Sequence, residues 1–212
     1  MKTEDLIGAL VADTATPTRP LGSTMAFAAL VGVISSGLLF WGVLGPRPDV
    51  ATAIATPRFL LKFVECAGLA AAAGTSAWAA MRPAADRRLG RAGLAAAVAI
   101  VVAGVLAEAF VVPSADWGTR LLGTNWLHCL TLVPLLALPA FAVLVAAARN
   151  GASTEPGRTG AILGIAAGAI GAFFYAANCT DDSPFFVATW YTLAIAATAV
   201  LGAFIGRRTL AW

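Results

Sequence analysis

Six long apolar stretches, separated by short polar segments, dominate the pattern of hydrophobic and polar positions along this chain. Each is about 20 residues long, the length that a helix needs to cross roughly 30 Å of hydrocarbon. The pattern predicts an all-α, polytopic membrane protein in which residues 24–206 form a six-helix transmembrane bundle. The stretches fall at about 24–44, 57–81, 92–112, 125–148, 159–177 and 185–205.

The composition excludes an ordinary water-soluble domain. Of the 212 residues, 59% are hydrophobic and 12% are charged, whereas soluble domains carry about 25% charged residues. The segments between the stretches are too short to form a separate catalytic domain. Any chemistry is therefore expected inside the bundle, on its loops or on the tail of residues 1–23, and that tail does not have the pattern of a signal peptide.

The arginines predict the orientation in the membrane. Four lie in residues 82–91, two in 149–158 and two in 207–212, whereas the linkers on the other side carry at most one each. Basic loops remain on the cytoplasmic side, so both termini are predicted to be cytoplasmic, with 207–212 as the C-terminal end. The net charge of +3 then reflects membrane topology, and no direct contact with nucleic acid is expected.

The start of the chain is a candidate partner-binding helix. Its apolar residues form one stripe at helical spacing, and acidic residues occupy its first turn, where the helix dipole favours them. A helix of about 11 residues is marginal alone in water, and an acidic face favours a protein groove with basic rims over a membrane-surface helix or a disordered tail. The candidate partner-binding residues are Leu6, Ile7, Leu10, Val11, Glu4 and Asp5.

Ionisable groups inside the stretches lie in the half nearest the weakly charged, outer side. Glu65, Glu108 and His128 are about 6–12 Å below that surface at 1.5 Å per residue, and intramembrane ionisable groups suggest function. Thiolate and imidazole suit zinc, copper or cadmium, although no closely spaced cysteine pair supports a metal site. The candidate metal ligands are Cys129, Cys179, His128, Glu108 and Asp181, with Glu65 and Asp182 nearby.

Structural roles compete with the ligand role for these groups. Lys62 and Glu65 stand three residues apart on one helical face, which favours mutual neutralisation. Glu108 and His128 alternatively form a buried hydrogen-bonded pair. The two adjacent aspartates that follow Cys179 fit a solvated turn, in which their carboxylates cap the following helix.

Three cysteines in a chain of this length do not make a disulfide framework. Cys129 and Cys179 are both expected at the outer edge, where three interpretations remain open: a structural disulfide, a redox-switchable disulfide and a metal-binding thiol pair. Cys66 lies deeper, among small apolar residues, and is expected to be an inert core thiol.

Local patterns also predict how the helices begin and pack. Thr56, Thr124 and Ser183 precede three of the stretches, as helix N-caps do, and proline follows two of them. Glycines recur at close to four-residue spacing within residues 160–171. Such spacing allows two helix backbones to approach closely, and we expect this approach within one bundle.

The chain resembles the NrsF-type anti-sigma factors of proteobacteria, which are integral inner-membrane proteins with six spans. The resemblance covers nearly the whole chain. It rests on residues 1–7, on Pro57-Arg58-Phe59-Leu60-Leu61-Lys62 at the second span, on Trp126-Leu127-His128-Cys129-Leu130 at the fourth, and on Asn178-Cys179.

This resemblance implies a non-enzymatic regulator in the bacterial inner membrane. Its N-terminal segment would hold an extracytoplasmic-function sigma factor away from RNA polymerase. Cys129 and Cys179 would face the periplasm and sense metal or oxidative stress, which places a switchable pair or a metal-binding pair slightly ahead of a permanent disulfide. No cofactor would be required, and zinc, copper or cadmium would be a sensed ligand. The competing classes are a membrane thiol oxidoreductase, which should carry a second close cysteine pair, and a small six-span transporter, which should have a polar path on both sides of the midplane.

Overall fold

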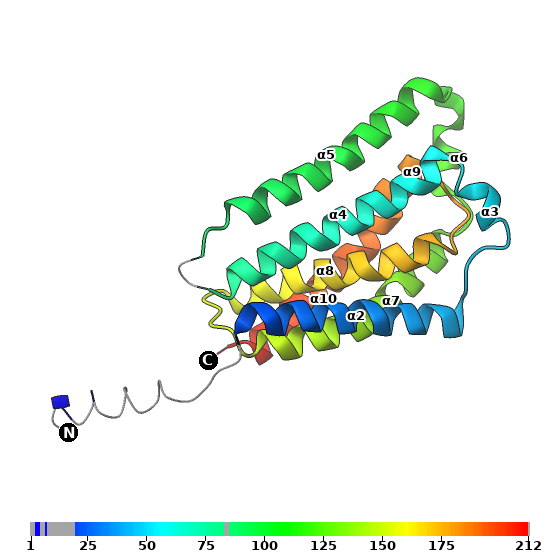
Figure 1. Ribbon diagram of the computed structural model, residues 1–212. Coiled ribbons are helices and arrows are strands. Elements are labelled where there is room, and N and C mark those ends of the chain that lie inside the picture. The colour runs from blue at the N-terminus through cyan, green and yellow to red at the C-terminus, as the bar shows by residue number, and fades with distance from the viewer. Residues whose placement is uncertain (1–2, 5–6, 8–19, 83–84, 212) are drawn as a thin grey trace.

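The structure is a computed structural model that describes residues 3–4, 7, 20–82 and 85–211. Within these residues, six helices are long and apolar enough to cross a membrane (Figure 1), as the sequence predicts. The sixth combines three consecutive segments, of which the middle one is a π-helical turn. The helices are α2 (Leu21–Val43), α4 (Pro57–Ala80), α5 (Arg88–Val111), α7 (Trp126–Ala148), α8 (Pro156–Ala176), and α9 (Pro184–Phe186) with η2 (Val187–Tyr191) and α10 (Thr192–Thr209).

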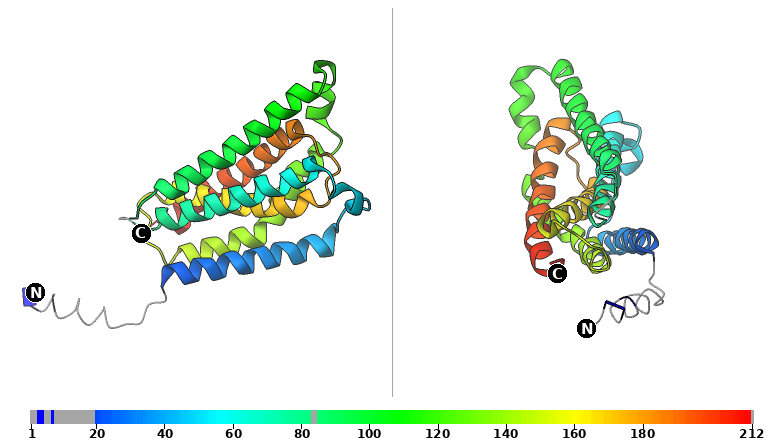
Figure 2. Two further views of the ribbon diagram at one scale, coloured as in Figure 1. Left: turned by 45° about the horizontal axis from the view of Figure 1, so that its top comes forward. Right: turned by 90° about the vertical axis from the view of Figure 1, so that its left-hand side faces the viewer.

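Helix α8 is the centre of the bundle. It packs against α10, α7 and α4, and 72% of its most apolar window is buried, compared with 17% for α5. Helix α5 lies at the rim (Figure 2), where it packs on α4 and on α9. The core therefore forms around α8, and α5 leaves most of its apolar surface for lipid.

The glycines of α8 allow the close packing that their spacing predicts. A Cβ at Gly160 would overlap the carbonyl oxygen of Gly202, and a Cβ at Gly164 would overlap that of Thr198. At the outer end of α8, a Cβ at Gly171 would lie 2.6 Å from the carbonyl oxygen of Val133 in α7. Since backbone atoms occupy the space in each case, only glycine fits, and the small residues serve packing within one bundle.

Thr56 and Ser183 occupy the N-cap positions of α4 and α9, as predicted, but their hydroxyls make no cap hydrogen bond. No side-chain hydroxyl caps α4, α7 or α9. The Thr56 hydroxyl donates to the carbonyl oxygen of Ala53 at 2.7 Å, and the Ser183 hydroxyl donates to the Glu108 carboxylate at 3.3 Å. Thr124 precedes α7 by two residues. At α7 the reason is tertiary, because the Asp181 carboxylate accepts the N–H groups ahead of that helix.

Three short helices lie in the outer linkers, where the sequence suggested only connecting segments. They are α3 (Val50–Ala53), η1 (Ser114–Asp116) and α6 (Trp117–Leu122). The Trp117 ring lies 5.7 Å from that of Phe185, and its indole nitrogen donates to the carbonyl oxygen of Val112 at 3.0 Å. These contacts with α9 and the end of α5 hold the linker against the bundle. In Figure 1 all three short helices lie at one end, whereas α2 begins and α10 ends at the other.

Candidate functional site

The two cysteines expected at the outer edge come together in the structure. Cys129 lies in the first turn of α7, and Cys179 lies in the loop that connects α8 to α9. Their side chains are 0% and 1% exposed, and both thiols are free. They share an apolar cluster with Tyr175, Phe186 and Tyr191. Two segments 50 residues apart therefore place two buried thiols in one apolar cluster.

Asp181 fastens the Cys179 loop to the start of α7. Its Oδ2 accepts the backbone N–H groups of Thr124 and Asn125 at 3.0 and 2.8 Å, and the Asn125 side-chain amide at 2.8 Å. The main-chain oxygen of Asn125 in turn accepts the backbone N–H of Cys129 at 2.8 Å. The carboxylate satisfies free N–H groups ahead of α7, where the helix dipole favours a negative charge. Asp181 therefore caps α7. The prediction that it caps the helix that follows it in sequence is wrong.

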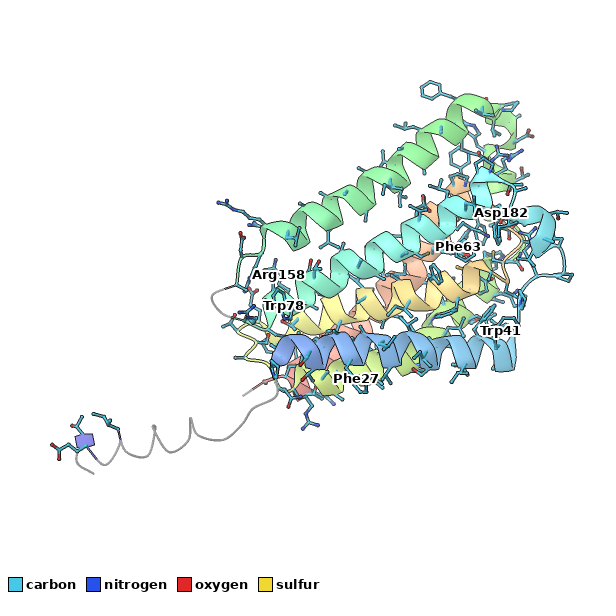
Figure 3. The ribbon with its side chains drawn as sticks, viewed as in Figure 1. Phe27, Trp41, Phe63, Trp78, Arg158 and Asp182 are labelled. Carbon is cyan, nitrogen blue, oxygen red and sulfur yellow. The ribbon has the colours of Figure 1, made fainter. Side chains whose placement is uncertain are left out.

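Two buried cations hold the same loop from the other side. The Lys62 ammonium donates to the carbonyl oxygen of Cys179 at 3.0 Å and pairs with Asp182 at 2.5 Å. Arg47 donates to the same carbonyl oxygen at 3.3 Å and to Asp182 at 2.9 Å. Figure 3 shows Asp182 at the outer end of the bundle. Because Lys62 is 1% exposed, Asp182 is the counter-charge that makes its burial tolerable.

The expected neutralisation of Lys62 by Glu65 is therefore wrong. Spacing of three residues places both groups on one face of α4, but the long lysine side chain extends to the outer loop and pairs there. Among the described residues, Glu65 forms no ion pair and lines a cavity beside Cys66. The spacing of Lys62 and Glu65 predicts that they share one face of α4. It does not predict which residues of other segments pack against that face.

Charge and burial set the protonation of the groups in the outer loops. Hydrogen bonds to Asp49, and then the pairing with Asp182, hold the pKa of Arg47 above its usual value. The same hydrogen bonds hold the pKa of Asp49 below its usual value. Burial raises the pKa of the Cys179 thiol. Since the thiolate is the reactive and metal-binding form, Cys179 is protonated and protected in this arrangement.

Glu108 does not pair with His128, so that alternative is also wrong. Its carboxylate accepts Arg58 Nε at 2.8 Å and Arg120 Nη1 at 3.0 Å, and its side chain is 2% exposed. His128 is exposed on α7. Glu108 thus ties together the ends of α4, α5 and α6, because Arg58 of α4 and Arg120 of α6 both extend to a carboxylate near the end of α5.

The tentative metal ligands do not gather around the two thiols. In the part of the chain that the structure describes, no three His, Cys, Asp or Glu side chains form a metal-binding group. The Glu108 carboxylate accepts hydrogen bonds from arginines, and the Asp181 carboxylate accepts them from backbone N–H groups. Cys66 is buried within the apolar cluster, as expected for a core thiol. Of the candidate metal ligands, Cys129 and Cys179 lie in one buried cluster.

Sequence reasoning missed Arg47, Arg58 and Arg120 as parts of the site. Arg47 and Arg120 lie in the linkers before α4 and α7, and Arg58 lies in the first turn of α4. Carboxylates at the same end of the bundle pair with all three. Predicted topology alone gives a signal for this, since it places these charges on one side of the membrane. Which carboxylate meets which cation depends on the packing of the helices.

Most of the partner-binding residues expected in the tail lie outside the described residues, namely Leu6, Leu10, Val11 and Asp5. Glu4 and Ile7 are described, and both are helical and exposed. The partner-binding role of the tail therefore stays a prediction.

Comparisons with known proteins agree with the resemblance seen in the sequence. The family model NrsF, described as negative regulator of sigma F, matches residues 10–212. The chain is 33% identical over 215 residues to the anti-sigma-F factor NrsF of Caulobacter vibrioides (strain NA1000 / CB15N). It is 31% identical over 220 residues to the probable anti-sigma-F factor NrsF of Azospira oryzae (strain ATCC BAA-33 / DSM 13638 / PS). Both alignments cover 100% of this chain and of the relative. No solved structure matches the chain.

Proposed function

Since this chain belongs to the NrsF family, we propose that it holds an extracytoplasmic-function sigma factor at the bacterial inner membrane and releases it under metal or oxidative stress. The N-terminal segment binds the sigma factor, and Cys129 and Cys179 receive the signal. The observation that carries this proposal is the separation of the two parts. The start of α7 and the loop before α9, which carry the two thiols, lie at the end of the bundle opposite to the start of α2, where the tail joins (Figure 1).

The distribution of charge supports cytoplasmic termini. At the outer end, Arg47, Arg58 and Arg120 each pair with a carboxylate. At the other end the arginines outnumber the carboxylates, which is the arrangement of a cytoplasmic face. The arginines at that end are Arg82, Arg87, Arg88, Arg91, Arg149, Arg158, Arg207 and Arg208.

The tail suits a protein partner with a basic rim. It joins α2 at the arginine-rich end, and its candidate helix presents Leu6, Ile7, Leu10 and Val11 beside Glu4 and Asp5. An amphipathic helix of this kind binds an apolar groove through residues one turn apart. Fastening the partner to a membrane anchor keeps it from RNA polymerase.

Two chemistries at the thiol pair account for sensing. In oxidation, the two thiols lose two protons and two electrons to a peroxide, which is reduced to water as the sulfur–sulfur bond forms. In metal binding, zinc, copper or cadmium displaces the two thiol protons, and further ligands come from water or from rearranged side chains. Either event requires Cys179 to leave its buried, protonated state, and this displaces the loop that Lys62 and Asp181 hold.

Tight helix packing offers a route for the signal to the cytoplasmic end. A shift of Cys129 moves α7, whose Val133 and Ala137 lie against Gly171 of α8. Helix α8 continues to the arginine-rich end, where Gly157 packs against Arg207 of α10. Because glycine contacts leave no free space, movement at one end changes the arrangement at the other, and the tail is then hidden or reoriented.

Recovery of partners from cells tests the proposal. The full chain carries an affinity tag at its C-terminus, is cross-linked in living cells, and its partners are identified by mass. We expect a sigma factor from unstressed cells and several-fold less of it after treatment with peroxide or cadmium. The Cys129→Ser variant is the control, since it should keep the partner under both conditions. Absence of any sigma factor from unstressed cells would reject the proposal.

A further inference from the structure

A groove separates α5 from α8 and α10, beginning at the arginine-rich end. Helix α5 packs on α4 and reaches α9 only near its outer end, so its inner half stands apart from α8. Two cavities lie in the groove. One of about 190 Å³ opens at the arginine-rich end, and one of about 420 Å³ lies further into the bundle. Arg158 lines the first of them, and Figure 3 shows Arg158 at the end of the bundle opposite to Asp182.

Three guanidinium groups surround the smaller cavity. Arg87 and Arg91 come from the start of α5, and Arg158 comes from the first turn of α8. Glu155 pairs with Arg158 at 2.9 Å and with Arg87 at 3.5 Å, and Arg91 forms no ion pair among the described residues. Three positive charges against one negative charge leave an excess of two. Guanidinium groups bind phosphate oxygens with paired hydrogen bonds.

The groove continues from these charges into an apolar cavity. Leu94 and Ile162 line the smaller cavity, and one helical turn further along the same helices Ala97 and Ile165 line the larger one. The larger cavity opens sideways toward lipid, since Val98 is 60% exposed. Its lining is apolar along α5, α8 and α10. A ligand that fits both cavities has an anionic head and a long apolar tail.

The apolar part of the groove fits within one leaflet. On α5 it runs from Leu94 to Val102, which is about 12 Å of helix at 1.5 Å per residue. Half of the roughly 30 Å hydrocarbon core is about 15 Å. Glu65 of α4 also lines the larger cavity, and its Oε1 lies 3.4 Å from a Cβ built at Gly104. An acyl chain from the inner leaflet thus ends near the carboxylate and need not pass it.

We propose that this groove is a binding site for an anionic phospholipid, with the headgroup phosphate at Arg87, Arg91 and Arg158 and one acyl chain in the larger cavity. Basic pockets between transmembrane helices on the cytoplasmic side suit such headgroups. Free phosphate would use the arginines but leave the apolar cavity empty. An acidic peptide is disfavoured, because at membrane depth an irregular backbone has no partners for its polar groups.

Lipid titration of the full chain tests the site. The purified protein in neutral detergent is titrated with phosphatidylglycerol, with zwitterionic phosphatidylethanolamine and with inorganic phosphate, and bound lipid is counted by native mass spectrometry. We expect saturable binding of phosphatidylglycerol that phosphatidylethanolamine does not match. Arg91→Ala should weaken it by about tenfold, since each basic group near an anionic surface contributes appreciably. The matched control is Arg208→Ala, which removes a cytoplasmic arginine stacked on Phe204 and should change binding less than about twofold.

A second variant separates the acyl chain from the headgroup. Ala97→Phe fills the larger cavity without changing charge, so we expect it to lose phospholipid while any weak binding of inorganic phosphate persists. The unfolding temperature without lipid verifies that each variant folds. Equal binding of both lipids, unchanged binding in Arg91→Ala, or phospholipid binding that Ala97→Phe leaves intact would each overturn the proposal. Binding that appears only after Glu4, Asp5 and Asp13 are neutralised would identify the tail as the occupant and also overturn it.

Discussion

Lys62, buried within the second long helix, forms an ion pair with Asp182 in the last outer loop, across 2.5 Å and 120 positions of sequence. The same ammonium donates to the main-chain oxygen of Cys179. One lysine therefore sets the position of a loop that carries half of the thiol pair. The stability of the outer end and the protection of Cys179 should change together when this contact is removed.

We expect Asp182→Asn to destabilise the bundle and expose Cys179. Removal of one partner leaves Lys62 buried without a full counter-charge, which typically costs about 3–5 kcal/mol. Thermal unfolding in detergent and the rate of alkylation of Cys179 measure the two effects. Asp49→Asn is the matched control, because Asp49 pairs with the same Arg47 at 2.7 Å but is exposed. Equal unfolding temperatures for the two variants would contradict the role of the buried pair.

Asp181→Ala should release the Cys179 loop from α7. The variant loses a carboxylate that accepts two backbone N–H groups ahead of a helix, a change that typically costs about 1–2 kcal/mol. Burial holds the pKa of Cys179 above its usual value, so alkylation of the parent protein should be slow at neutral pH. Its rate should still be increasing at pH values above the pKa of an ordinary thiol. In the variant the same rise should occur at lower pH. Asp116→Ala, in the neighbouring linker, should leave the pH profile unchanged.

Serine at Cys129 or at Cys179 should preserve repression and abolish induction. Either change removes one sulfur of the pair while keeping a side chain of similar size in the buried cluster. A reporter for the sigma factor, measured with and without peroxide or cadmium, gives the result. Cys66→Ala serves as the control, since Cys66 lies deeper in the same cluster. Full induction in both serine variants would exclude a thiol switch, and a lost response in Cys66→Ala would implicate the third thiol.

Leu6→Asp combined with Leu10→Asp should abolish capture of the sigma factor while membrane insertion continues. Charges at both positions interrupt the apolar stripe that we expect to enter the partner. Co-purification is measured in cross-linked cells, with the amount of protein in the membrane as the reference. The control places the same two charges in the linker, at Thr16 and Thr18. Retained co-purification in the leucine variant would move the binding segment elsewhere.

Gly164→Ala should weaken the contact between α8 and α10. The new methyl group would overlap the carbonyl oxygen of Thr198, and overpacking against a backbone typically costs about 1–3 kcal/mol. Gly68→Ala is the control within α4, because no described atom lies within 4 Å of a Cβ built there. In that helix alanine should be neutral or slightly stabilising. Unfolding temperatures in detergent compare the two, and a similar loss in both would contradict close packing at Gly164.

The positions of the helices followed closely from the sequence, and details of the outer loops did not. The expected stretch 57–81 is α4 at Pro57–Ala80, and 125–148 is α7 at Trp126–Ala148. Both succeed because a bilayer requires an apolar helix of fixed length, which composition alone reveals. The predicted cap of α7 by Thr124 failed because the acceptor there is Asp181, more than 50 residues away.

The sequence by itself determined that the chain is a six-helix membrane protein, that its arginines crowd one end, and that Cys129 and Cys179 lie at the other. Hydrophobic length and charge placement are local properties, and they require no knowledge of neighbouring helices. Only the tertiary structure decided that Lys62 pairs with Asp182 and not with Glu65, that Glu108 binds two arginines, and that α5 leaves a groove beside α8. Each of these depends on which side chains the packed helices place opposite one another, because the energy of a buried charge is set by its partner in space.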